Sequence, residues 1–443
     1  MGKVLDLAEK LWIGETDTYL NHPFAEPYEI EEIKEGLWFN RSFSNSIIRK
    51  TSEGLIIIDP AAQFDEAIRH KKIRSVTKDK VHSVIYTHGH VDHCFGLNQY
   101  YRECKRNKWE KPQIISHENV PSRFDRYEET HGYNAYINQR QFLAGQGQPY
   151  FPTGFIYPTI TFSDSYTLDV GEVIVELYHG KGETDDAIWA YLPQDEVLCT
   201  GDLFIWGVPN GGNPQKAPRY IKEWSETLLK MAEKGATILL PGHGVPIIGK
   251  DRVKEALTKT AEFLGSLYNQ TIELMNLGLP LLNIIEKVTF PDELMKKSYL
   301  QPIYDEPEFL IRNVWRLKGG QYDGIPSHLK PASEKDLANE IAELAGGPER
   351  LAERAMTLLQ ENKLRLACHL IEWALCANPK NEKLKNIYRD IFRERIYSET
   401  STMAIGIYLS AIRNIGEDPG EDLAGNTPIF VQRKIAESKK KVD

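Results

Sequence analysis

Four side chains that commonly bind metal ions lie within six positions, at residues 88–93. This stretch reads HGHVDH and directly follows Val81–Thr87, whose apolar pattern predicts a buried β-strand. Side chains two positions apart on an extended segment point the same way, so His88 and His90 are placed to hold one cation. Asp92 and His93 then turn toward a second. Imidazole and carboxylate groups are the usual ligands of catalytic zinc, and the sequence therefore predicts a metal centre rather than a chance group of surface histidines.

Short strands and helices alternate around this cluster, which predicts an α/β fold. Functional sites in α/β sheets favour the carboxyl ends of strands, which is where the HGHVDH stretch falls. We interpret Trp38–Arg49 as one strand and place Thr159–Phe162 in a second sheet. The other predicted strands are Leu55–Ile58, Ile114–Ile115, Tyr166–Leu168, Val173–Tyr178, Ala187–Leu192, Val197–Thr200 and Thr237–Leu240, and the helices of this half are Asp65–Thr77, Cys94–Lys105 and Tyr220–Lys234.

The second half of the chain is mostly helical. A length of 443 residues suggests two or three domains, and the stretch 318–331 is rich in Gly and Pro, as linkers are. Helices are expected near 334–346, 348–361, 363–377, 380–397 and 400–414, and their apolar faces suit packing or dimerisation better than a repeat array. We therefore expect a catalytic domain at 1–260, a helical connection at 261–331, a helical domain at 332–415 and a tail at 416–443.

Charge and composition narrow the functional classes. The net charge is −9 and no long basic run is present, which disfavours nucleic-acid binding. Neither a signal peptide nor an apolar stretch of the ~18 residues that span a bilayer is apparent, so the expected location is cytoplasmic. The five cysteines are widely spaced, which argues against a disulfide framework or a thiolate zinc site.

The HGHVDH stretch resembles the HxHxDH motif of the metallo-β-lactamase superfamily. Two later landmarks of that superfamily follow in order, namely Gly201-Asp202-Leu203 after one predicted strand and Pro241-Gly242-His243-Gly244 after another. The resemblance implies an αββα sandwich. Most members have Gly-His-Thr where this chain has Gly182-Glu183-Thr184, and a carboxylate at that position is a feature of the alkylsulfatase branch.

The helical half resembles the same branch. The segment Tyr322–Pro326, the pair Gly346-Gly347 and the stretch 367–379 (ACHLIEWALCANP) resemble the alkylsulfatase dimerisation domain, so the likeness covers roughly residues 30–415 and implies a homodimer. Three features depart from the branch. It usually has glutamate where Asp202 stands, it commonly carries a C-terminal domain resembling sterol-carrier proteins for which this chain leaves no room, and its secreted forms have signal peptides.

The resemblance also implies a ligand set and a reaction. His88, His90 and Glu183 would hold the first metal, Asp92, His93 and His243 the second, and Asp202 would bridge them. Asp92 and Asp202 would act catalytically with a metal-bound hydroxide that cleaves alkyl sulfate esters to alcohol and sulfate. Two divalent ions are expected; zinc suits the site, and such carboxylate-rich ligation also tolerates iron or manganese.

A sulfate ester needs donors for its remaining oxygens. Lys216, Arg219 and Asn210 lie on one loop after Asp202, and a guanidinium fork suits tetrahedral oxyanions. An alternative role for Arg219, which we weigh equally, is to cap the following helix or to form an ion pair on it. Two further functions stay open at this point: hydrolysis of a phosphoester, thioester or lactone on the same fold, and a non-catalytic assembly scaffold.

Overall fold

The computed structural model describes residues 2–142 and 150–415. The chain divides into two compact units, of which the first comprises residues 1–134 and 151–320 and the second residues 135–150 and 321–443. Each unit is described by itself. The predicted tail at 416–443 lies outside the described residues, and the predicted boundaries at 260 and 331 stay predictions.

The first unit begins with helix α1 (Lys3–Trp12) and a sheet that carries the HGHVDH stretch. Within the described residues this sheet has seven strands in sequential order. Strands β1 to β4 pair antiparallel, and β4 to β7 pair parallel. The strands are β1 (Glu29–Lys34), β2 (Leu37–Arg41), β3 (Ser46–Thr51), β4 (Gly54–Ile58), β5 (Val81–Ile85), β6 (Gln113–His117) and β7 (Ile160–Phe162).

A second sheet of six described strands lies against the first. Its order is β13-β12-β11-β10-β9-β8, with β11 and β12 parallel and the other pairs antiparallel. Apolar side chains of both sheets form one buried cluster that includes Ile56, Ile85, Val175 and Leu240. The strands are β8 (Ser165–Val170), β9 (Val173–His179), β10 (Ile188–Leu192), β11 (Val197–Ile205), β12 (Ile238–His243) and β13 (Ile247–Ile248).

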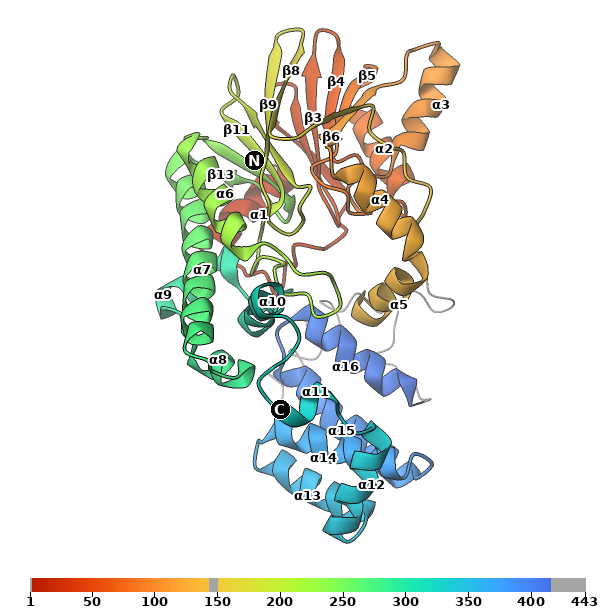
Figure 1. The fold of residues 1–443 in the computed structure, drawn as a ribbon. Helices are drawn as coiled ribbons and strands as arrows, with labels where there is room; N and C mark the ends of the chain where they lie inside the picture. Colours follow the sequence, from red (N-terminus) through yellow and green to blue (C-terminus); the bar gives the residue numbers. More distant parts are fainter. Residues whose placement is uncertain (1, 143–149, 416–443) are drawn as a thin grey trace. The chain divides into compact units, whose positions relative to one another are not determined.

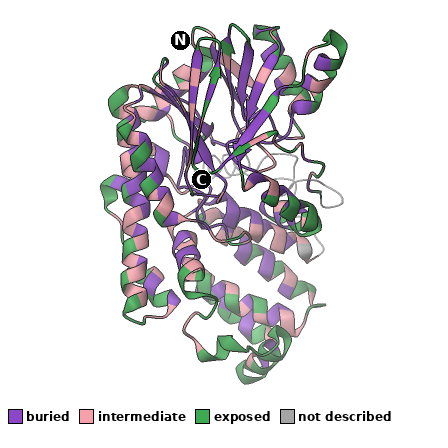
Figure 2. Cartoon of the chain, turned by 45° about the horizontal axis from the view of Figure 1, so that its top comes forward, coloured by how far each residue is buried: buried purple, intermediate pink, exposed green. Residues whose placement is uncertain are grey.

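Helices cover the outer faces of the two sheets (Figure 1), and buried residues concentrate on the strands between them (Figure 2). A separate apolar cluster joins the second sheet to the helices on its outer side. The expected αββα sandwich is therefore confirmed. The remaining helices of this unit are α2 (Glu66–Val76), α3 (Leu97–Asn107), α4 (Val120–Glu129), the start of α5 (His131–Phe142), α6 (Ile221–Glu233), α7 (Lys250–Asn276), α8 (Leu281–Lys287), α9 (Asp292–Met295), the 3-10 helix η1 (Ser298–Leu300) and α10 (Pro307–Gly319).

Two strand predictions were wrong. Trp38–Arg49 is not one strand but the hairpin of β2 and β3, because residues 42–45 leave the sheet. There the backbone N–H and the side-chain amide of Asn45 donate to the carbonyls of Gly242 and Pro241, at 2.7 and 2.9 Å. Thr159–Phe162 was assigned to the second sheet, yet β7 pairs with β6 in the first sheet.

The second unit is helical, as expected. Its helices are α11 (Pro326–Leu329), α12 (Glu334–Ala345), α13 (Pro348–Gln360), α14 (Leu364–Ala377), α15 (Glu382–Ser398) and α16 (Thr402–Asn414). Buried side chains such as Ala355, Ile371, Leu384 and Phe392 pack these helices into one cluster. Asn381 and Ser401 cap α15 and α16 by accepting bonds from the first free backbone amides. No helix in the described part of the chain is long and apolar enough to cross a bilayer.

Candidate metal centre

The seven residues predicted as metal ligands come from four segments of the first unit. The loop after β5 carries His88, His90, Asp92 and His93, and the loop between β9 and β10 carries Glu183. Asp202 lies within β11, and His243 is the last residue of β12. Because β11 and β12 are parallel neighbours, their carboxyl ends bring these two side chains to the same edge of the sheet.

The donor atoms fall into two groups, each within 4.8 Å. One group is His88, His90 and Asp202, and the other is Asp92, His93 and His243. Glu183 is in neither group, although its Oε1 lies 3.6 Å from Nδ1 of His90. Asp202 also faces the second group, since its Oδ1 lies 3.4 Å from Nε2 of His93 and its Oδ2 lies 3.2 Å from Nε2 of His243. Its carboxylate thus stands between the groups.

The separations between donor atoms fit metal coordination. Two ligand atoms of a tetrahedral zinc ion, each about 2.1 Å from it, lie roughly 3.4 Å apart. Oδ2 of Asp92 lies 3.3 Å from Nε2 of His93 and 3.4 Å from Nε2 of His243, and Nε2 of His88 lies 3.8 Å from Oδ2 of Asp202. These spacings suit donors that converge on a cation.

Buried polar atoms without partners support the same interpretation. Among the described residues, Nε2 of His88, Nε2 of His93, Oε2 of Glu183 and Oδ1 of Asp202 are buried and have no hydrogen-bond partner. Leaving such atoms unpaired costs roughly 1–3 kcal/mol each. A divalent cation would satisfy these atoms together, so the donor set fits a metal centre.

The ionisation of the cluster also favours a cation. Burial lowers the pKa of His88 and His90, which keeps their imidazoles neutral, as metal ligands are. Although burial acts in the opposite sense, the nearby carboxylates of Asp92, Asp202 and Asp59 raise the pKa of His93 well above its usual value. The pocket is thus rich in negative charge that a divalent cation would neutralise.

Hydrogen bonds behind the imidazoles fix which nitrogen faces the centre. Asp59 accepts from His93 Nδ1 at 2.8 Å, from the Thr87 hydroxyl at 2.6 Å and from the Thr87 backbone amide at 2.8 Å. His88 Nδ1 in turn donates to the Thr87 hydroxyl oxygen at 3.1 Å, and His243 Nδ1 donates to the carbonyl of Phe43. With Nδ1 protonated, each Nε2 is left to bind metal.

Two further carboxylates hold the HGHVDH loop in place. Asp186 is fully buried and accepts from the backbone amide of Gly89 at 3.1 Å and from Nε of Arg123 at 2.7 Å. Arg123 also pairs with Asp185. A Cβ at Gly89 would lie 2.8 Å from Cδ of Arg123, so glycine is needed where this side chain passes under the loop.

Glycine is also required beside the two late ligands. A Cβ at Gly242 would lie 2.2 Å from Oδ1 of Asp202. Gly201 has φ +49, in the left-handed region, and a Cβ there would lie 2.6 Å from Oγ1 of Thr87. Both positions let the backbone approach the centre closely.

The three predicted substrate contacts gather around Glu183. Nη1 of Arg219 donates to Oε1 of Glu183 at 2.6 Å and also to the carbonyl of Asn210, and the amide of Asn210 donates to the same carboxylate oxygen. Burial raises the pKa of Glu183 to about 7 although Arg219 opposes this. Burial, with the charge of Arg219 second, lowers the pKa of Lys216 to about 8.

The sequence analysis missed several side chains that shape the site. It assigned no role to Asp59 or Asp186. A sequence signal for Asp59 was present, because this aspartate ends a buried strand (LIIIDP). In the structure its backbone takes φ +54. An aromatic stack was also missed, in which Phe24 lies 4.1 Å from the ring of His243 and 4.3 Å from the ring of Tyr304.

Comparison with known proteins identifies the family. Residues 40–243 match the family model of the metallo-beta-lactamase superfamily, and residues 281–417 match that of the alkyl sulfatase dimerisation domain. The chain is a metallo-β-lactamase superfamily member with an alkyl sulfatase dimerisation domain. Membership in this superfamily implies divalent metal binding, which agrees with the two groups of donor residues.

Curated relatives and a solved structure agree with this assignment. A linear primary-alkylsulfatase of a Pseudomonas species is 25% identical over 86% of this chain and 75% of its own length. An alkyl/aryl-sulfatase of Saccharomyces cerevisiae is 24% identical over 81% of this chain, which spans 59% of that relative. A stereoselective inverting sec-alkylsulfatase from Pseudomonas, 22% identical, matches the fold with a TM-score of 0.77 over 88% of this chain and 66% of that structure.

Proposed function

We propose that this protein is a dinuclear metal-dependent hydrolase that cleaves alkyl sulfate esters to alcohol and sulfate. The observation that carries the proposal is the position of Glu183. Its carboxylate lies 3.6 Å from His90 and accepts a hydrogen bond from Arg219 of residues 210–219, which we call the cationic loop. The curated relatives of the chain are alkylsulfatases. Divalent cations held there supply Lewis acidity and a nucleophilic water at neutral pH.

The proposed ligand roles follow the two donor groups for six residues and the family resemblance for Glu183. His88, His90 and Glu183 hold one cation, and Oε1 of Glu183 lies 3.6 Å from Nδ1 of His90. Asp92, His93 and His243 hold the other, and Asp202 bridges the two. In spite of burial, the positive charge of His93, whose Nε2 lies 3.3 Å from Oδ2 of Asp92, holds the pKa of Asp92 at about 2. Asp92 is therefore ionised at neutral pH. Zinc suits this ligand set, and iron or manganese is an alternative.

The cationic loop is proposed to bind the sulfate group. Arg219 and Asn210 already bond to Glu183, which holds their donors beside a residue proposed to bind the first cation. Asn313 fixes the loop by accepting from the backbone amide of Arg219 at 2.8 Å and donating to its carbonyl at 2.9 Å. Lys216 adds a half-buried positive charge. Such fixed donors stabilise the negative charge that develops on the leaving sulfate.

Sulfate release from a panel of alkyl sulfates, from short chains to dodecyl, tests this proposal. We expect the metal-loaded protein to release sulfate and the Glu183→Ala and His90→Ala variants to lose that activity. Lys254→Gln, an exposed substitution on α7, serves as the matched control and should retain it. The proposal fails if no alkyl sulfate is cleaved while a phosphoester, thioester or lactone is turned over.

We further propose that the second unit joins two copies of the chain. The support is the match to the alkyl sulfatase dimerisation family over residues 281–417. Two leucines seven residues apart on α12, Leu337 and Leu344, are 40% and 80% exposed and lie on one face of the helix. Sedimentation equilibrium should give a dimer, and Leu344→Lys should weaken it. A monomer at micromolar concentration would contradict the proposal.

A further inference from the structure

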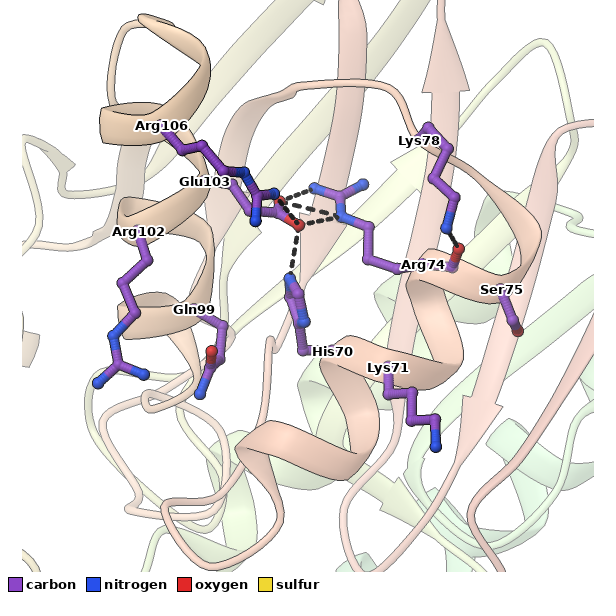
Figure 3. Close-up of a pocket in the computed structure, with 9 residues that line it drawn as sticks. All are labelled: His70, Lys71, Arg74, Ser75, Lys78, Gln99, Arg102, Glu103 and Arg106. Carbon is purple, nitrogen blue, oxygen red and sulfur yellow. Dashed lines mark hydrogen bonds and ion pairs between the residues drawn. The ribbon is translucent and has the colours of Figure 1, made fainter.

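A basic groove lies between α2 and α3 in the first unit. It has a volume of about 620 Å³, within the usual range for small-molecule sites. None of its lining residues is among the seven predicted metal ligands. Figure 3 shows its walls, which α2 and the turn after it form on one side and α3 on the other; the lining residues are His70, Lys71, Arg74, Ser75, Lys78, Gln99, Arg102, Glu103 and Arg106.

The floor of the groove is rigid and its one carboxylate is already paired. Arg74 donates from Nε and Nη2 to Glu103, at 3.0 and 2.6 Å, and from Nη1 to the carbonyl of Asp79 at 2.9 Å. His70 Nε2 lies 2.9 Å from the same carboxylate. The guanidinium of Arg74 also lies over the ring of Tyr100, 5.2 Å from its centre. Glu103 is thereby neutralised within the floor.

The rim of the groove is left strongly positive. Lys71, Lys78, Arg102 and Arg106 line it in addition to Arg74, so five cationic side chains face one carboxylate. The chain as a whole carries a net charge of −9, which makes this local excess of positive charge distinctive. Like charges gathered at short range repel one another, and a bound anion would relieve that repulsion.

Favourable interactions with helix dipoles explain only some of the cationic side chains at this groove. Lysine and arginine are favoured in the last turn of a helix, and Arg74 and Arg106 lie there on α2 and α3. Lys71 and Arg102, however, lie at the middle of their helices, where the dipole effect is small. Both are exposed and line the groove (Figure 3). Their placement therefore calls for another partner.

We propose that this groove binds a small organic anion carrying two phosphate or sulfate groups. The cations stand on both walls, with Lys71 on α2 and with Arg102 and Arg106 about one turn apart on α3, roughly 6 Å along its axis, which offers separate partners to two anionic groups. Arginine forks bind tetrahedral oxyanions through paired N–H donors, and lysines add point charge at the rim. The inference is independent of the proposed sulfatase activity, because it concerns residues outside the metal centre.

Calorimetric titration of the metal-loaded protein with fructose 1,6-bisphosphate tests the proposal. We expect saturable binding, at least tenfold weaker in the double variant Lys71→Gln/Arg102→Gln. The control Lys254→Gln/Lys287→Gln removes the same charge from exposed positions elsewhere and should bind within twofold of the unchanged protein. Circular dichroism verifies that each variant is folded.

Three results would overturn the inference. Absence of saturable binding would remove the site. Equal weakening in the two double variants would mean that overall charge, not the groove, attracts the ligand. Loss of binding in His90→Ala, with Lys71→Gln/Arg102→Gln unaffected, would place the bisphosphate at the metal centre instead.

Discussion

Replacing Asp59 with Asn should switch the tautomer of His93, a proposed metal ligand, without disturbing the fold. Asp59 takes φ +54, a conformation that Asn tolerates about as well as Asp. Its Oδ1 accepts from the backbone of Thr87, and its Oδ2 accepts both from the Thr87 hydroxyl and from His93 Nδ1. In the variant an NH₂ group replaces Oδ2. That group donates, so His93 would have to accept at Nδ1 and carry its proton on Nε2.

The expected cost follows from this tautomer change. A protonated Nε2 cannot bind a cation, and loss of such supporting partners usually weakens metal affinity by roughly 10- to 100-fold. This corresponds to about 1.4–2.7 kcal/mol. The affinity should be measured by competition with a chromophoric chelator, alongside thermal unfolding of the metal-free protein.

Asp195→Asn is the matched control for this experiment. Asp195 is also a buried aspartate, but it pairs with Arg49, 3.0 Å away, and not with the centre. We expect its metal affinity to be unchanged. Unchanged affinity in Asp59→Asn as well, in a folded variant, would refute the tautomer argument.

Three further substitutions test other parts of the account. Gly242→Ala places a Cβ 2.2 Å from Oδ1 of Asp202, so metal content should fall and alkyl sulfate turnover should drop roughly 100-fold; normal turnover would contradict the close approach. Arg219→Lys removes the Nη1 donor that bonds Glu183, and kcat/KM should fall roughly 10- to 100-fold; an unchanged value would exclude a sulfate contact. Burial raises the pKa of Asp305 to about 7 from 3.8, so the stability that its protonated carboxyl contributes is present below pH 3.8 and lost as pH rises through 7. Asp305→Asn should therefore gain stability relative to the unchanged protein between pH 4 and pH 8, by up to about 4 kcal/mol in urea unfolding; a pH-independent difference would be the contrary result.

Structural features that depend on residues close together in the chain could be predicted from the sequence. Helix α6 and helices α12 to α16 fall within about three residues of their expected bounds, because apolar periodicity and capping residues mark them, whereas α11 lies in the stretch expected to be a linker. The HGHVDH stretch, Asp202 and His243 could be predicted because each follows or ends an apolar strand in a short motif. The proposed ligand roles of these residues stay a prediction for experiment.

Features that depend on distant residues could not be predicted. The break between β2 and β3 depends on bonds from Asn45 to residues about 200 positions away. The role of Asp59 depends on Thr87 and His93, which are 28 and 34 positions along the chain. Likewise, the groove between α2 and α3 appears only when two helices that are ordinary in sequence lie side by side.

The most direct test of the account is the metal content per chain, measured by mass spectrometry of the purified protein and two variants. The account predicts about two equivalents of divalent metal in the unchanged protein. It predicts about one in His90→Ala, which removes a ligand of the first group, and about one in His243→Ala, which removes a ligand of the second. One equivalent or none in the unchanged protein, or two equivalents retained in both variants, would contradict the dinuclear centre.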